Sequence, residues 1–286
     1  MLQYLLTQWI RQQAQQKLME AVAAAASGQQ AEHDADESDT PPTPVQVAIL
    51  FALNIEAAGV LDMALDLYTT RNATFVEHVG PWQQRQVCVA EIGAGANAAA
   101  QAASDVIALH RPAWVISAGF AGGLVNELPR GHLLMADPVC DLAGRELSVG
   151  FKIDPVVLAQ SPKLHVGRLV TVDQVIRTER EKRALAAQTG AVACDMETAA
   201  IAEVCRAQKT RFLSVRVISD AVTDELPREI ERLMQSKTLA KQLGAAAGAI
   251  MKRPSAVKDL WQLREDAIRY SDRLAKFLSG VVGQLP

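Results

Sequence analysis

Three carboxylates stand at positions where the surrounding residues are otherwise apolar or small. Glu56 follows the run "VQVAILFALNI", Glu197 opens the stretch "ETAAIAEVC", and Asp220 ends "FLSVRVISD". Each has an ordinary explanation when taken alone, as a charge in the first turn of a helix, a helix cap, or a partner of Arg216. Each also lies near the carboxyl end of a predicted strand or at the start of the next helix. Because those ends meet at one edge of a parallel sheet, the three acids are predicted to share a cleft and to perform acid–base chemistry.

The elements that must position these acids follow from the apolar pattern. Strands are predicted at residues 45–53, 86–93, 113–119, 132–140, 164–172 and 212–220. Helices are predicted at residues 56–67, 96–110, 178–189, 196–208, 225–249 and 255–282. Apolar strands that alternate with helices indicate an α/β fold with a mainly parallel sheet covered by helices on both faces.

The chain divides by composition into three parts. Residues 1–26 carry a broken apolar stripe and predict an N-terminal helical appendage, which we expect to pack on the surface or on a second subunit rather than to dock a partner. Residues 27–44, "SGQQAEHDADESDTPPTP", are polar, acidic and rich in proline, which is typical of a flexible linker. Residues 45–286 are predicted to form the catalytic domain, with helices at its C-terminal end.

Bulk composition narrows the class of protein. The 286 residues are 49% hydrophobic and carry a net charge of −3, so the chain offers no broad basic surface for nucleic acid or an anionic membrane. No stretch approaches the roughly 20 apolar residues of a membrane span, and the N-terminus is a poor signal peptide, so we expect a cytoplasmic protein. The cysteines lack a CxxC spacing and the histidines are scattered. We therefore expect neither a metal nor a cofactor.

Two glycine-rich segments follow predicted strands. "GAGANA" (residues 93–98) matches G-x-G-x-x-A, but the next strand does not end in the acid that would hold a ribose. We interpret it as a tight strand-to-helix turn. "SAGFAGGL" (residues 117–124) places small residues at the carboxyl end of a strand, where a ligand can approach the backbone closely. We expect this second segment to bind a ligand.

The motifs "SAGFAGGL", "DMETAAIA" and "VRVISD" together resemble the nucleoside phosphorylase and nucleosidase superfamily, most closely its methylthioadenosine/S-adenosylhomocysteine nucleosidase branch. The resemblance runs from Val45 to Asp224. It implies a three-layer α/β/α fold around a central mixed, partly barrel-like sheet. It also implies assembly as a homodimer or a larger homo-oligomer.

The resemblance implies hydrolysis of the N-glycosidic bond of an adenosine-type nucleoside. Asp220 would be the general acid that protonates the leaving purine near N7. Glu56 would activate the attacking water, and we expect Arg216 to orient Glu56. Glu197 would accept hydrogen bonds from the ribose 2′ and 3′ hydroxyls while Met196 presents an apolar edge to the sugar.

Other positions are implied to complete the substrate site. Ser117, Ala118 and Gly119 would contribute backbone contacts near the sugar and the water, and Ile176 would lie where related enzymes contact the purine. Val175 stands where the nucleosidase branch commonly has an aromatic residue that stacks on the base. This departure, together with a first loop that lacks the usual glycine and further acids, leaves the substrate less defined than the reaction class.

Two alternatives remain open at this point. A phosphate-dependent nucleoside phosphorylase would need cations, but neither "FALNIEA" nor "VISAG" contains the arginine expected there, which favours water as the nucleophile. Such a phosphorylase could act on a nucleoside with a large apolar 5′ group. The second alternative is a non-catalytic nucleoside-binding module, although a neutral nucleoside does not require three acids for its recognition.

Overall fold

A computed structural model describes residues 44–150, 153, 155–226 and 254–286, which belong to one compact unit. The predicted appendage (1–26), nearly all of the predicted linker and most of the predicted helix at 225–249 lie outside the described residues. Within those described residues, no helix is long and apolar enough to cross a membrane.

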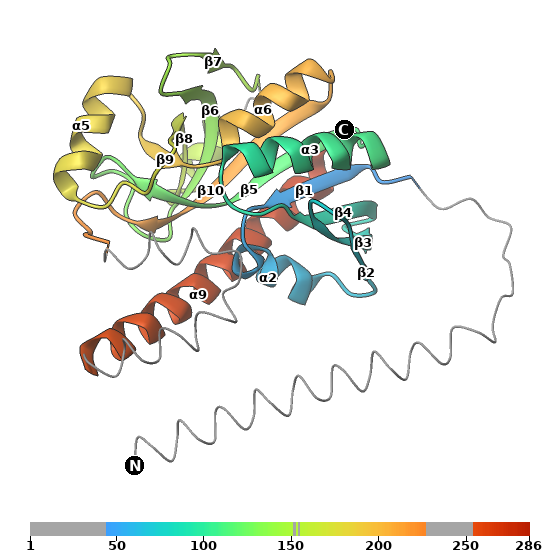
Figure 1. Cartoon of the computed structure of the whole chain (residues 1–286), viewed down its shortest axis with the longest axis horizontal. Coiled ribbons are helices and arrows are strands. Elements are labelled where there is room, and N and C mark those ends of the chain that lie inside the picture. Colours follow the sequence, from blue (N-terminus) through green and yellow to red (C-terminus); the bar gives the residue numbers. More distant parts are fainter. Residues whose placement is uncertain (1–43, 151–152, 154, 227–253) are drawn as a thin grey trace, which may run out of the picture. The chain divides into compact units, whose positions relative to one another are not determined.

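A mixed sheet forms the centre of the fold (Figure 1). Parallel pairing joins four strands in the spatial order β4 (Arg85–Glu91), β1 (Val47–Phe51), β5 (Trp114–Gly123) and β10 (Arg211–Asp220). Three more strands, β6 (Leu133–Asp141), β8 (Leu164–Thr171) and β9 (Ala193–Asp195), connect β10 back to β5. Five strands thereby close into a barrel-like portion. This matches the partly barrel-like sheet that the resemblance implies and corrects the mainly parallel sheet expected from the alternation of elements.

Helices cover both faces of the open part of the sheet (Figure 1). The helices concerned are α2 (Asn54–Met63), α3 (Ala96–His110), α6 (Thr198–Ala207) and α9 (Pro254–Gln284). Side chains of β1 alternate between the two faces, so that Ile49 and Phe51 share a core with α2 and α9, whereas Ala48 and Leu50 share one with α3 and α6. The three-layer α/β/α architecture is therefore confirmed.

The remaining elements are short or peripheral, and the apolar pattern did not predict most of them. The strands β2 (Tyr68–Arg71) and β3 (Val76–Trp82) extend the sheet beyond β4, and β7 (Glu146–Leu147) pairs with β6. Helix α4 (Pro155–Ala159) precedes β8 and was not predicted. Helix α5 (Glu179–Thr189) agrees with the helix predicted at residues 178–189. The segment "SAGFAGGL" lies almost wholly inside β5, so this strand continues four residues beyond its predicted end at residue 119.

Candidate active site

One hollow gathers most of the residues that the sequence singled out. It is lined by Leu50, Ala52, Glu56, Ile92, Ser117, Ala118, Gly119, Phe120, Glu197, Ile201 and Arg216. These residues come from the carboxyl ends of parallel strands and from the starts of the helices that follow them, as expected for ligand sites in α/β sheets. Both acids of the hollow are buried, with Glu56 5% and Glu197 8% exposed.

Glu56, in the first turn of α2, is held by two backbone N–H groups. Its Oε2 accepts from Leu53 N at 2.9 Å, and its Oε1 accepts from Phe120 N at 2.8 Å. Gly119 leaves room for the carboxylate, because a Cβ atom there would lie 2.8 Å from Oε1 of Glu56. Burial raises the pKa of Glu56, and the two N–H donors and the charge of Arg216 only partly oppose that effect.

Glu197 stands at the N-cap of α6, with its carboxylate toward the "GAGANA" segment. Its Oε1 accepts a hydrogen bond from Gly95 N at 2.7 Å. Burial, followed by the negative charge of Asp195, raises the pKa of Glu197 to about 8. The segment interpreted as a mere turn therefore holds one of the acids of the site. The G-x-G-x-x-A match was the available signal, but it suggested a different ligand.

The hydrogen bonds of Arg216 go to neighbours other than Glu56. Its Nη2 and Nε donate to Oδ2 of Asp195 at 2.8 and 3.1 Å. The same Nη2 donates to Ser117 Oγ at 2.7 Å and to Thr198 Oγ1 at 2.5 Å. The prediction that Arg216 orients Glu56 is therefore wrong, because the guanidinium is held by a buried network and acts on Glu56 only through its charge.

Asp195 belongs to this network and also binds the first residue of α6, Thr198. Its carboxylate accepts from Thr198 N at 3.1 Å and from Thr171 Oγ1 at 2.8 Å. The helix predicted at residues 196–208 begins at Thr198.

Asp220 ends β10 beside the hollow and is not one of its lining residues. It is 7% exposed and pairs with Gly122 of β5, two positions beyond the Phe120 N–H that holds Glu56. Its Oδ2 accepts from Lys182 Nζ at 2.6 Å, and its Oδ1 accepts from Ser219 Oγ at 2.7 Å. The partner of Asp220 is thus Lys182, which the sequence analysis did not single out, rather than Arg216.

The residues implied to contact the sugar edge and the base are not part of the lining of the hollow. Met196 and Ile176 are half-buried and pack on a cluster that includes Leu124 and Cys194. Val175 is half-buried between β8 and α5. These side chains are not among those that line the hollow.

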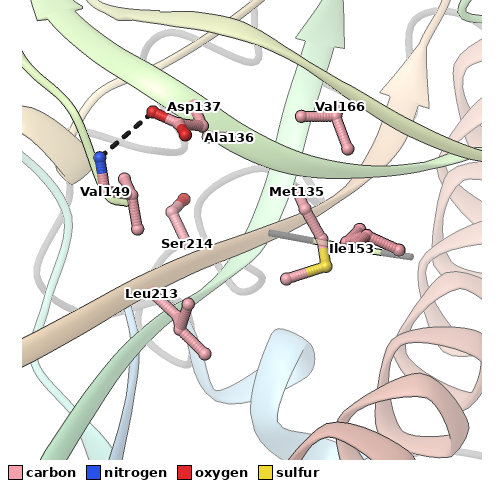
Figure 2. A pocket seen from close by; sticks show the side chains of 8 residues that line it. All are labelled: Met135, Ala136, Asp137, Val149, Ile153, Val166, Leu213 and Ser214. Atoms are coloured by element: carbon pink, nitrogen blue, oxygen red, sulfur yellow. Dashed lines mark hydrogen bonds between the residues drawn. The ribbon is translucent and has the colours of Figure 1, made fainter. Parts of the chain in front are cut away.

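A second hollow lies near the amino end of β10, away from Asp220 (Figure 2). Its lining is apolar except for Asp137 and Ser214. Oδ1 of Asp137 accepts from Val149 N at 3.1 Å, and Ser214 Oγ is buried without a hydrogen-bond partner. A lining with one carboxylate, already bonded to backbone, offers no acid–base pair, so the hollow of Glu56 and Glu197 is the candidate site.

Three potential metal ligands also converge elsewhere, at the end of α3. Glu77, Cys88 and His110 place their ligand atoms within 4.8 Å of one another. Hydrogen bonding accounts for the group, since Glu77 Oε2 pairs with His110 Nε2 at 2.5 Å and with Cys88 Sγ at 3.7 Å, while Asn72 Nδ2 donates to Oε1 at 3.1 Å. A buried carboxylate satisfied by three donors is a stable structural element in its own right.

A closed five-stranded barrel within an α/β/α sandwich, with buried acids at its strand ends, defines the class of the protein. The family model described as "Phosphorylase superfamily" matches residues 46–163 and 156–252, and the chain belongs to this superfamily. The resemblance stated from the sequence is thereby confirmed.

Curated relatives place the chain near one branch of the superfamily. A 5′-methylthioadenosine/S-adenosylhomocysteine nucleosidase of Shewanella loihica is 26% identical over 209 residues, which are 65% of this chain and 91% of the relative. The nucleosidase of the same name from Colwellia psychrerythraea is 25% identical over 240 residues, covering 72% and 99% of the two chains.

Solved structures share the fold at lower identity. A mutant of the Helicobacter pylori methylthioadenosine nucleosidase, with 5′-methylthioadenosine in its active site, superposes with a TM-score of 0.64 at 19% identity, over 84% of this chain and 99% of that chain. The futalosine hydrolase of the same organism gives a TM-score of 0.62 at 19% identity, over 84% and 98%.

Proposed function

We propose that the protein is a purine nucleosidase that hydrolyses the N-glycosidic bond of an adenosine-type nucleoside of the methylthioadenosine/S-adenosylhomocysteine class. One observation carries this proposal: Glu56 and Glu197 are buried and face the same hollow, and Asp220 ends the adjoining strand. The names of the curated relatives support the same reaction and the same substrate class.

Glu56 suits the activation of water. Two N–H donors fix its carboxylate, and a raised pKa makes the ionised form a stronger base than an exposed glutamate. A water bound to Glu56 would lose a proton to the carboxylate as its oxygen attacks the anomeric carbon. Ser117, Ala118 and Gly119 line the same hollow and would contact the sugar or that water.

Glu197 suits the recognition of the ribose. One oxygen is held by Gly95 N, and the carboxylate remains available for the 2′ and 3′ hydroxyls. Once ionised, Glu197 would also stabilise the cationic character that the sugar develops as the glycosidic bond breaks. Met196 would lie against the sugar, and Val175 and Ile176 would lie near the base.

Asp220 would complete the reaction as the general acid. The departing purine takes the electron pair of the C1′–N9 bond, and a proton delivered to N7 neutralises that charge. Such a transfer is typically worth about a hundred- to ten-thousand-fold in rate.

Water is a better nucleophile for this hollow than phosphate. Arg216 is the one cationic side chain among the lining residues, and its guanidinium already binds Asp195. A phosphate dianion would also lie close to Glu56 and Glu197, so its charge would be poorly compensated.

A base-release assay tests the proposal. Purified protein is incubated with adenosine, methylthioadenosine, S-adenosylhomocysteine and inosine, each with and without phosphate. We expect adenine and a free sugar from the 5′-thio nucleosides without phosphate. A sugar 1-phosphate formed only with phosphate would show a phosphorylase instead. Nucleoside binding without turnover would show a binding module.

A further inference from the structure

Lys182 is a buried cation whose ammonium group contacts the carboxylate of Asp220. It lies on the first turn of α5, and its side chain is 0% exposed. Its Nζ donates to Oδ2 of Asp220 at 2.6 Å, to the carbonyl oxygen of Ala221 at 2.7 Å and to that of Asp224 at 3.0 Å. All three protons of the ammonium are therefore used, and an ammonium so buried is stable only with a partner of opposite charge.

The sequence around Lys182 fixes it in place. Thr178 caps α5, accepting from Glu181 N, and the Glu181 carboxylate accepts in return from Thr178 N. Lys182 N donates to Thr178 O at 3.0 Å. The backbone that carries the lysine side chain is therefore fixed by the capped N-terminus of α5. The ammonium thus has a defined position relative to Asp220.

Among the described residues near Asp220, the other ionisable groups do not supply its carboxylate with a positive charge in place of Lys182. Cys194 of β9 lies on the same side of Gly122, and burial, followed by the charge of Asp220, raises the pKa of its thiol, which therefore stays neutral. Asp224 is paired with Arg130 Nε at 2.5 Å and accepts from Ala221 N at 2.6 Å. The guanidinium of Arg216, four residues before Asp220 on the same strand, is bound to Asp195. Within the described part of the chain, Lys182 is the cation that contacts Asp220.

We propose that Lys182 is the positioning residue of the acid: it orients the Asp220 carboxyl toward the leaving base and holds a positive charge against the carboxylate that remains once the proton has left. The inference rests on the proposed function. As C1′–N9 breaks, the Asp220 proton passes to N7 of the purine, and the carboxylate that remains is stabilised by the ammonium. An opposite charge at this distance stabilises a carboxylate, so Lys182 makes the transfer more favourable.

The test measures kcat and KM for base release by the wild type and by Lys182→Met, which keeps the length of the side chain without its charge. We expect kcat to fall at least about tenfold. KM should change little, because Lys182 contacts the acid and does not line the hollow. Arg180→Met, an exposed residue of the same helix, is the matched control and should leave both unchanged. Lys182→Gln carries the same test if Lys182→Met does not fold.

A double variant separates positioning from general damage. Single-turnover rates with excess enzyme are compared for Asp220→Asn and for Lys182→Met with Asp220→Asn. If Lys182 acts through Asp220, adding Lys182→Met causes little further loss. An unchanged kcat in Lys182→Met, or losses that multiply in the double variant, would overturn the inference while leaving an active nucleosidase. A wild type that releases no base would instead overturn the proposed function.

Discussion

The backbone N–H of Gly95 donates to Oε1 of Glu197 at 2.7 Å and joins two segments that are 102 residues apart in the sequence. Gly95 is the N-cap of α3 and has φ +94° and ψ 149°, a conformation that residues with a Cβ rarely adopt. The turn from β4 to α3 thus directs a backbone donor at a buried acid. Its glycine serves the carboxylate of the site rather than the phosphates of a dinucleotide.

Replacing Gly95 with alanine should therefore impair activity through the backbone. A Cβ at this position meets nothing within 4 Å, so steric crowding is not the cause. The strained φ should lower the free energy of unfolding by about 1–3 kcal/mol. Relaxation of that strain moves the N–H away from Glu197, so we expect KM for the nucleoside to rise. Steady-state kinetics and urea unfolding measure the two effects.

Gly144→Ala is the matched control for this substitution. Gly144 has φ +79° and open space around its Cβ position, but it lies between β6 and β7 and does not line the hollow. It should lose comparable stability and keep its KM. Equal changes in KM for both variants would show that Gly95 acts only through stability.

Arg216→Met tests whether the Arg216–Asp195 pair is structural. The substitution leaves the Asp195 carboxylate buried without its cation, which should lower the free energy of unfolding by about 3–5 kcal/mol. Arg206→Met removes an exposed arginine paired with Glu203 on α6 and should change stability little. Chemical denaturation of both variants checks the contrast. Similar stabilities would mean that Asp195 finds other compensation.

The sequence predicted those parts of the site that depend on strand ends. Glu56 and Glu197 meet in one hollow because parallel strands end at the same edge, and the pattern of apolar runs locates those ends. The strands β2 and β9 were not predicted, since all four residues of Tyr68–Arg71 are exposed and β9 has only three residues. Neither gives the alternation that marks a strand.

Lys182 and Gly95 were missed for a different reason. Lys182 lies within "REKRA", a charged run typical of a solvent-exposed helix face, and its burial arises only when α5 packs beside the end of β10. The donor at Gly95 is a backbone N–H, which every residue except proline carries, so the residue type does not reveal its role. Contacts set by packing between distant elements therefore limit what the chain alone reveals.

The pH dependence of stability should report on Glu197. Its pKa is raised from the ordinary value of 4.5 to about 8, so between these values the folded protein holds a proton that the unfolded chain has lost. The free energy of unfolding should therefore be highest near pH 5 and fall as the pH rises toward 8, by an amount on the order of 2–4 kcal/mol from this group. Urea unfolding of the ligand-free protein at pH 5, 6.5 and 8 measures the slope.

Glu197→Gln should reduce that slope, because glutamine has no proton to lose. Some slope should remain, since burial also raises the pKa of Glu56 and acts in the same direction. Glu203→Gln on the same helix is the control: the hydrogen bond from Arg206 lowers the pKa of Glu203, so its contribution falls below this pH window. If Glu197→Gln keeps the full wild-type slope, the Glu197 carboxyl is already ionised near pH 5, and its negative charge must then be balanced within the hollow before any substrate binds.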